Sequence, residues 1–166
     1  CGSFILGNQE IFADRVEFNP PSTQTIGMFP AFEPKGTIEG WKETINFYNR
    51  ENFELHQFVV GSSFGSVLMT LSPINCAALH IHSKESGVGK TTAIAAAVSV
   101  WGRPEELIIH ERDTFNIKMH RGEIYHNLPL YMDELTNSRA SELSNLAYQL
   151  TAVSYTHLRA HETRHD

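Results

Sequence analysis

Ten consecutive residues combine the side chains and the backbone freedom that a bound phosphate group requires. They read Ser83-Lys-Glu-Ser-Gly-Val-Gly-Lys-Thr-Thr92. Glycines at 87 and 89 let the chain turn so that successive N–H groups converge on phosphate oxygens. Lys90 adds a mobile positive charge, and a helix that begins at this point directs its positive end at the same anion. The segment therefore predicts a phosphate-binding loop.

Each position of this loop has an expected partner on a nucleoside triphosphate. The ammonium of Lys90 would reach the β- and γ-phosphates, the hydroxyl of Thr91 would bind Mg²⁺, and Thr92 would approach the α-phosphate. Lys84 stands where the usual Gly-x-x-x-x-Gly-Lys-Thr pattern begins with glycine, so the first turn is expected to differ. A chance match at the start of a helix is the alternative. The residues expected to bind the nucleotide are Ser86, Gly87, Val88, Gly89, Lys90, Thr91 and Thr92.

A pair of carboxylates follows an apolar segment farther along the chain. Leu128-Pro-Leu-Tyr-Met-Asp-Glu-Leu135 is typical of a strand that ends in acidic residues. Asp133 would hold Mg²⁺ opposite Thr91, and Glu134 would polarise the water that attacks the terminal phosphate. Lys90 and Glu134 are thus the predicted catalytic residues, and Thr91 and Asp133 the predicted metal ligands. A solvated turn is the alternative for an isolated acidic pair.

The elements that must position these residues alternate between apolar segments and helical patterns. Such alternation predicts an α/β fold with a parallel sheet, here a partial P-loop NTPase core built as strand, loop and helix. His80 and His82 alternate on the first strand and are expected to be packed. Gly102 is expected to cap the C-terminal end of the helix that begins at Lys90. The expected elements are strand 76–82, helix 90–101, strand 107–109, helix 114–124, strand 130–132 and helix 138–150.

A small α+β region is expected over residues 1–72, ahead of an ATPase region at 73–152. Two short apolar runs around Gly7-Asn8 predict a hairpin, and residues 15–18 a third strand. Four prolines in 19–36 indicate an irregular surface connection. Helices are expected from Thr37, as N-cap, to Asn49, and over 52–71. The uncharged stretch 57–83 is interpreted as a buried helix and a buried strand rather than a membrane span.

The composition and net charge of the chain limit the kinds of function that it can have. The chain has 166 residues, 13 Lys plus Arg, 19 Asp plus Glu and a net charge of −6, so binding to nucleic acid would need a local basic patch. Its two cysteines are too few for a disulfide framework, and no signal peptide is recognisable at the start, which favours the cytoplasm. Candidate arginines for phosphate or DNA contact, each more typical of a solvated surface, are Arg103, Arg112, Arg121 and Arg139.

The last residues differ from the rest of the chain. Residues 153–163 resemble the translation of a transposase sequencing adapter, so 153–166 are interpreted as a non-native tail and the chain as a fragment cut at both ends. The alternatives are an ordinary polar terminus and a metal site at His157, His161 and His165, which would share one helix face.

Several of these stretches together resemble the domain-of-unknown-function nine-two-seven family of phage, plasmid and bacterial proteins. The resemblance rests on Gly87–Ile94, Ser99–Pro104, a Thr-containing segment at 114–116 and Asn127–Glu134, and extends upstream to Gly36–Trp41 and Phe4–Gly7. It implies a ring-forming, helicase-type ATPase associated with primase modules in DNA replication. The family positions that match here are Gly87, Gly89, Lys90, Thr91, Asp133 and Glu134.

The sequence thus predicts Mg²⁺-dependent ATP binding and hydrolysis in a mobile-element replication protein, with ATP, DNA and further copies of the chain as partners and no membrane. The rival is a nucleotide-gated regulatory or assembly module without helicase activity. A P-loop kinase is a third interpretation, to which Glu134 is less suited because a kinase transfers phosphate to a substrate hydroxyl.

Overall fold

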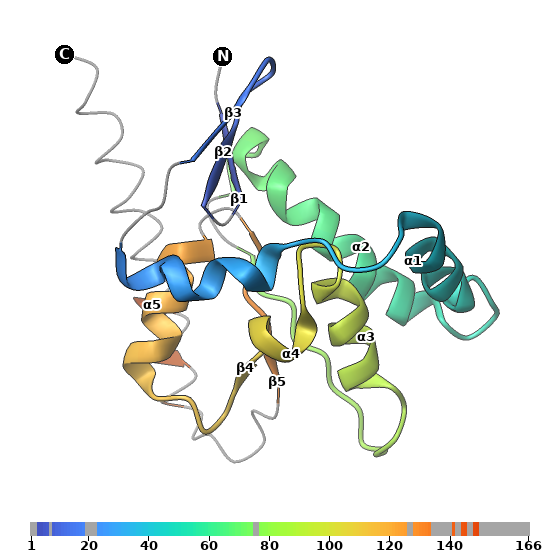
Figure 1. Cartoon of the computed structure of the whole chain (residues 1–166). Coiled ribbons are helices and arrows are strands. Elements are labelled where there is room, and N and C mark those ends of the chain that lie inside the picture. Colours follow the sequence, from blue (N-terminus) through green and yellow to red (C-terminus); the bar gives the residue numbers. More distant parts are fainter. Residues whose placement is uncertain are drawn as a thin grey trace.

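The computed structural model of the chain describes residues 3–6, 8–18, 23–74, 77–125 and 128–133, and residues 141, 144, 145, 148 and 149. It is a mixed α/β structure with one antiparallel and one parallel sheet (Figure 1). Its elements in chain order are β1 (Phe4–Leu6), β2 (Gln9–Ile11), β3 (Val16–Phe18), the 3₁₀-helix η1 (Thr23–Phe32), α1 (Ile38–Ile45), η2 (Asn46–Tyr48), α2 (Glu54–Leu68), η3 (Met69–Leu71), α3 (Lys90–Val98), α4 (Pro104–Leu107), β4 (Ile109–His110), α5 (Phe115–Tyr125) and β5 (Met132–Asp133).

The first three strands form an antiparallel sheet in the order β1-β2-β3, which confirms the predicted hairpin and its third strand. Phe4 pairs with Ile11, and Ile11 pairs with Val16 on the other side. The ring of Phe4 lies 6.1 Å from the ring of Trp101, centroid to centroid. This contact attaches the small sheet to the main core, because Phe4 and Trp101 both pack against its buried residues.

The segment after the hairpin differs from its prediction. Residues 23–32 of the predicted irregular connection form η1, and Phe29, Ala31 and Phe32 are buried. Burial of two aromatic rings offsets the loss of the backbone donor at Pro30, which is why proline content alone misled the prediction. In Figure 1, η1 runs across the molecule between α5 and α1. Residues 19–22 lie outside the described part of the chain.

Helix α1 begins where predicted. Thr37 is its N-cap, and the Thr37 hydroxyl accepts a hydrogen bond from the Gly40 N–H at 3.2 Å. Glu39 lies in the first turn, where a negative charge is favourable. The helix continues through η2 to Tyr48, so the predicted range to Asn49 is confirmed within one residue.

Helices α2 and α3 pack against each other. Val59, Val60 and Ser63 of α2 are buried, and the hydroxyl of Ser63 donates to the Ala97 carbonyl at 2.6 Å. The rest of α2 is not the fully buried helix that was predicted for the stretch from residue 57, since Phe58, Phe64 and Leu68 are exposed. No helix formed by the described residues is both long and apolar enough to cross a membrane.

The main core contains buried residues of η1, α3, α4 and α5 and lies beside a short parallel sheet. Strands β4 and β5 run parallel, with Ile109 opposite Met132 and His110 opposite Asp133. Figure 1 shows α3 and α5 on opposite sides of this sheet. Helix α5 confirms the predicted helix 114–124, and the two strands begin two residues later than predicted. The predicted helix 138–150 lies largely outside the described residues.

One predicted strand is wrong. A strand was predicted over 76–82, but residues 77–83 have no regular secondary structure. Ala77 to His80 are exposed. His80 and His82 are accordingly exposed rather than packed, with ring centroids 6.3 Å apart. A strand needs a partner edge to pair its N–H and C=O groups, and β4 and β5 offer two residues each.

Gly102 has a different role from the predicted helix cap. Helix α3 ends at Val98 with Ser99 as its C-cap, so Gly102 lies beyond the helix end. A Cβ at Gly102 would lie 2.1 Å from the Ala31 carbonyl oxygen and 2.8 Å from Leu107 Cδ1. Beside it, the Arg103 N–H donates to the Ala31 carbonyl at 2.8 Å. Glycine is required here because η1 passes directly over this backbone.

This close approach gives a prediction with a matched control. We expect Gly102→Ala to lower the free energy of unfolding by about 1–3 kcal/mol, because a methyl group overlaps with backbone that cannot move independently. Gly61→Ala, in the exposed face of α2 with no atom within 4 Å of the added Cβ, should instead raise it by about 0.5–1 kcal/mol. Urea unfolding of both variants measures the difference, and equal effects would contradict the close packing of η1 on Gly102.

Candidate functional site

The loop before α3 has the backbone conformation that its glycines were expected to provide. Residues 84–89 form a series of bends. Gly87 has φ +77° and Gly89 has φ +83°, both in the left-handed region that residues with a Cβ rarely adopt. Gly89 is also the N-cap of α3. The two glycines therefore turn the chain sharply at the point where the helix begins.

Lys90, the first residue of α3, folds back over this loop. Its Nζ donates to the Glu85 carbonyl at 3.1 Å, and the Glu85 N–H in turn donates to the Ser83 hydroxyl at 3.1 Å. The ammonium group is thus held across the loop by a backbone carbonyl, which is an acceptor that another oxygen could replace.

The start of α3 leaves polar groups accessible. The first backbone hydrogen bond of the helix runs from the Ala93 N–H to the Gly89 carbonyl at 2.9 Å, so the amides of Lys90, Thr91 and Thr92 precede it. Four of the seven predicted nucleotide-binding residues have exposed side chains, namely Ser86, Val88, Thr91 and Thr92. The positive end of α3 therefore coincides with exposed hydroxyls and a lysine.

His56 belongs to this site although its sequence position gave no sign of it. Its Nε2 lies 2.9 Å from the Val88 carbonyl oxygen, so a residue in the first turn of α2 is bonded to the loop 32 positions later. The His56 ring lies against Tyr48 and Phe53, with centroids 5.4 and 5.0 Å away. The cluster of aromatic residues around His56 was visible in the sequence, but nothing local indicated which distant segment it would contact.

Of the predicted acidic pair, only Asp133 lies in the described part of the chain. Asp133 ends β5, is half-buried and lies opposite His110, at the carboxyl end of a parallel strand. Glu134 lies outside the described residues. Ile81, just before the loop, and Tyr131, just before β5, both pack against the buried cluster of Val59, Ala93 and Ala97. The segments that lead to the loop and to Asp133 therefore converge where α2 packs against α3.

A buried hydrogen-bonded chain fixes the segment that carries Asp133. The Tyr131 hydroxyl donates to the Ser63 hydroxyl at 2.6 Å, and Ser63 donates to the Ala97 carbonyl. The Ile109 N–H donates to the Tyr131 carbonyl at 2.9 Å. Burial raises the pKa of Tyr131 to about 12, and the hydrogen bond with Ser63 has a smaller, lowering effect on that pKa. The phenol therefore joins α2, α3 and the parallel sheet in its protonated form.

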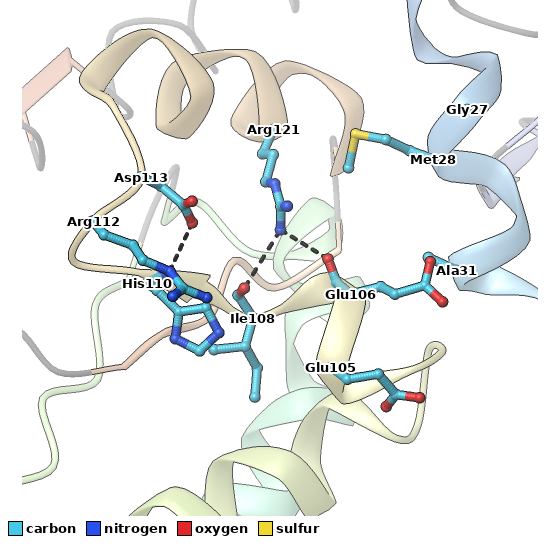
Figure 2. A pocket seen from close by; sticks show the side chains of 10 residues that line it. All are labelled: Gly27, Met28, Ala31, Glu105, Glu106, Ile108, His110, Arg112, Asp113 and Arg121. Atoms are coloured by element: carbon cyan, nitrogen blue, oxygen red, sulfur yellow. Dashed lines mark hydrogen bonds between the residues drawn. The ribbon is translucent and has the colours of Figure 1, made fainter.

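A cavity in the described part of the chain lies away from this loop. It measures about 340 Å³ and opens between η1, α4 and α5 (Figure 2). Arg121 reaches into it and donates to the carbonyls of Glu106 at 2.9 Å and Ile108 at 3.5 Å, while Asp113 accepts from the His110 N–H at 2.8 Å. Among the described residues predicted to bind nucleotide or metal, none lines this cavity, whereas the candidate arginines Arg112 and Arg121 do. Because the Arg121 side chain bonds to the surrounding backbone, it has a structural role here.

Two more of the candidate arginines, Arg103 and Arg112, lie in the described part of the chain. Arg103 forms an ion pair with Glu106 at 2.7 Å and donates to the Pro30 carbonyl at 2.8 Å, so it binds η1 to α4. Arg112 is an exposed residue at the rim of the cavity. No group of three or more His, Cys, Asp or Glu that could hold a metal occurs in the described part of the chain. Arg139 and the histidines at 157, 161 and 165 lie outside it.

These observations define a mixed α/β protein with a glycine-turned loop, a lysine and an accessible helix start. The chain belongs to the family described as Domain of unknown function (DUF927), whose model matches residues 1–163. No curated protein matches the chain, and no solved structure does. The family assignment agrees with the resemblance seen in the sequence and assigns no activity.

The raised pKa of Tyr131 predicts a loss of stability in alkali. The unfolded chain releases the phenol proton near the ordinary value of 10.0, whereas the folded chain holds it to about 12. The stabilisation is therefore complete below pH 10 and falls as the pH rises toward 12. Burial also raises the pKa of Tyr125, which adds to the effect.

Urea unfolding at a series of alkaline pH values measures this loss. Tyr131→Phe should be less stable than the wild type at neutral pH, because it removes the hydrogen bond with Ser63, and should lose less stability on going to alkaline pH. An equally steep alkaline decrease in that variant would contradict the assignment to Tyr131.

Proposed function

We propose that the chain binds ATP with Mg²⁺ through the loop 83–92 and that the parent protein hydrolyses it. The observation that carries this proposal is the position of Lys90, whose Nζ lies on the Glu85 carbonyl across a loop turned by two left-handed glycines. This arrangement holds a cation over a short stretch of backbone at the positive end of a helix. A polyphosphate is the ligand chemistry that suits it best.

Different groups of the loop would make different contacts with the nucleotide. The main-chain amides of 86–89 and the first amides of α3 would donate to phosphate oxygens. The Lys90 ammonium would exchange the Glu85 carbonyl for a phosphate oxygen, at little cost because both partners accept the same hydrogen bond. The exposed hydroxyls of Thr91 and Thr92 would complete the contacts. The departure at Lys84 affects the start of the loop, ahead of these groups.

The donor set also suits Mg²⁺. Thr91 offers a hydroxyl and Asp133 a carboxylate, and hard cations of this kind prefer oxygen ligands. When bound there, the ion would offset the negative charge of the phosphate oxygens. Glu134, next to Asp133 in the sequence, would orient and deprotonate the attacking water, and Lys90 would stabilise the charge that develops on the leaving phosphate.

A role in DNA replication is the broader part of the proposal. It rests on the resemblance of the chain to phage, plasmid and bacterial proteins associated with primase modules, and this is an association rather than a feature of the site. In that setting ATP turnover would drive strand separation by a ring of subunits in the cytoplasm, with DNA as the second partner.

Binding is tested by titrating a fluorescent ATP analogue with the purified chain in Mg²⁺. We expect Lys90→Ala to weaken binding by about 10- to 100-fold, which is the loss of one charge-assisted hydrogen bond to phosphate. Lys84→Ala is the matched control, since it removes the same charge from an exposed position of the same segment and should change the affinity little. Equal losses in both variants would indicate general charge attraction and contradict a specific role for Lys90.

Hydrolysis is tested separately on the full-length parent. Glu134→Gln should keep ATP affinity within about 3-fold while lowering turnover by at least 100-fold, because the amide retains the shape but cannot take a proton. Single-stranded DNA should raise the wild-type rate. Tight ATP binding with little turnover and no response to DNA would favour the nucleotide-gated module, and a phosphorylated small-molecule product would favour a kinase.

A further inference from the structure

We infer that His56 is a positioning residue for the phosphate-binding loop, because it fixes the orientation of the peptide bond between Val88 and Gly89. This inference rests on the proposed function and adds to it a residue from outside the loop. The bond between His56 Nε2 and the Val88 carbonyl, 2.9 Å long, joins the first turn of α2 to the loop just before α3.

The geometry of a peptide bond explains the effect. In a trans peptide the C=O and the following N–H point in opposite directions. His56 holds the Val88 carbonyl toward α2, so the N–H of Gly89 is directed away from α2. A rotation of this peptide would exchange the two groups and present a carbonyl oxygen where an amide had been. An anion is bound by amides and repelled by carbonyl oxygens, so the orientation of this peptide bears directly on phosphate affinity.

His56 is itself held in place. Its ring is nearly parallel to that of Tyr48, at an interplanar angle of 23°, and Phe53 packs on it at 53°. The Gln57 amide donates to the Tyr48 carbonyl at 2.6 Å, which connects η2 to the same turn of α2. The ring therefore cannot follow a rotating peptide without leaving its aromatic neighbours.

The surroundings of His56 also determine which nitrogen of its imidazole ring carries the hydrogen. Val88 offers a carbonyl, which only accepts, so Nε2 carries the hydrogen. Nδ1 is buried and has no partner among the described residues, and a hydrogen there would be a buried donor without an acceptor. The tautomer with hydrogen on Nε2 is thus the one that the site supports.

Gly89 accommodates the approach of His56. A Cβ at position 89 would lie 3.1 Å from His56 Nε2, closer than an ordinary contact, in addition to the left-handed φ of +83°. Glycine is therefore needed at 89 both for the turn into α3 and for space beside the imidazole. The hydrogen bond between His56 and Val88 places the loop and α2 in direct contact at this point.

The experiment compares two substitutions of similar size that differ in the donor. His56→Gln keeps an N–H donor at the reach of Nε2, whereas His56→Leu fills the space without one. We expect His56→Leu to weaken binding of the fluorescent ATP analogue by roughly 3- to 10-fold and His56→Gln to stay within about 2-fold of the wild type. His80→Leu, at an exposed histidine, is the control and should bind like the wild type. Thermal unfolding without nucleotide checks that each variant is folded.

The outcomes are distinct. Rescue by Gln with loss in Leu supports the inference, since a purely structural role of the ring would make both variants equally weak. If Leu binds like the wild type while Lys90→Ala loses binding, the inference is overturned and the proposed function remains. If the wild type itself binds no nucleotide, both are overturned. Should His56→Leu fail to fold, His56→Asn, whose shorter amide cannot reach Val88, takes its place with the same expected loss.

Discussion

The packing of α3 on two sides is the constraint on which the rest of the molecule depends. One face of α3 presents Ala93 and Ala97 to α2, and the other presents Ile94 and Val98 to the core of η1, α4 and α5. The small side chains let α2 approach closely enough for Ser63 to bond to the α3 backbone. Because the loop is continuous with α3, a helix buried on both sides gives the loop a rigid base.

The same packing explains how segments that are far apart in sequence come to act together. α2 brings His56 to the loop, and Tyr131 brings the end of β5 to α2 and α3 through Ser63. Neither His56 nor Tyr131 belongs to the loop or to the acidic pair. The site is therefore built from a local loop and from two supports supplied by the tertiary structure.

The sequence predicted the local parts of this arrangement well. Glycines at 87 and 89, the helix start at Lys90 and the cap at Thr37 depend on nearest neighbours, and the structure confirms them. The parts that failed depend on distant partners. Residues 76–82 have the composition of a strand, but pairing requires an edge that the sequence of that segment does not specify. The burial of η1 and the role of His56 likewise depend on surfaces that form elsewhere in the chain.

The passage of η1 over the start of α4 affects how the protein can form during synthesis. Pro30 accepts a hydrogen bond from Arg103, 73 positions later, and Phe32 shares a core with Leu107 and Tyr125. On the ribosome, the apolar side chains of η1 emerge long before the surface that covers them exists. They must stay exposed to water or be held by a chaperone until α4 and α5 are made. Final folding of this chain is thus delayed until most of it has left the exit tunnel.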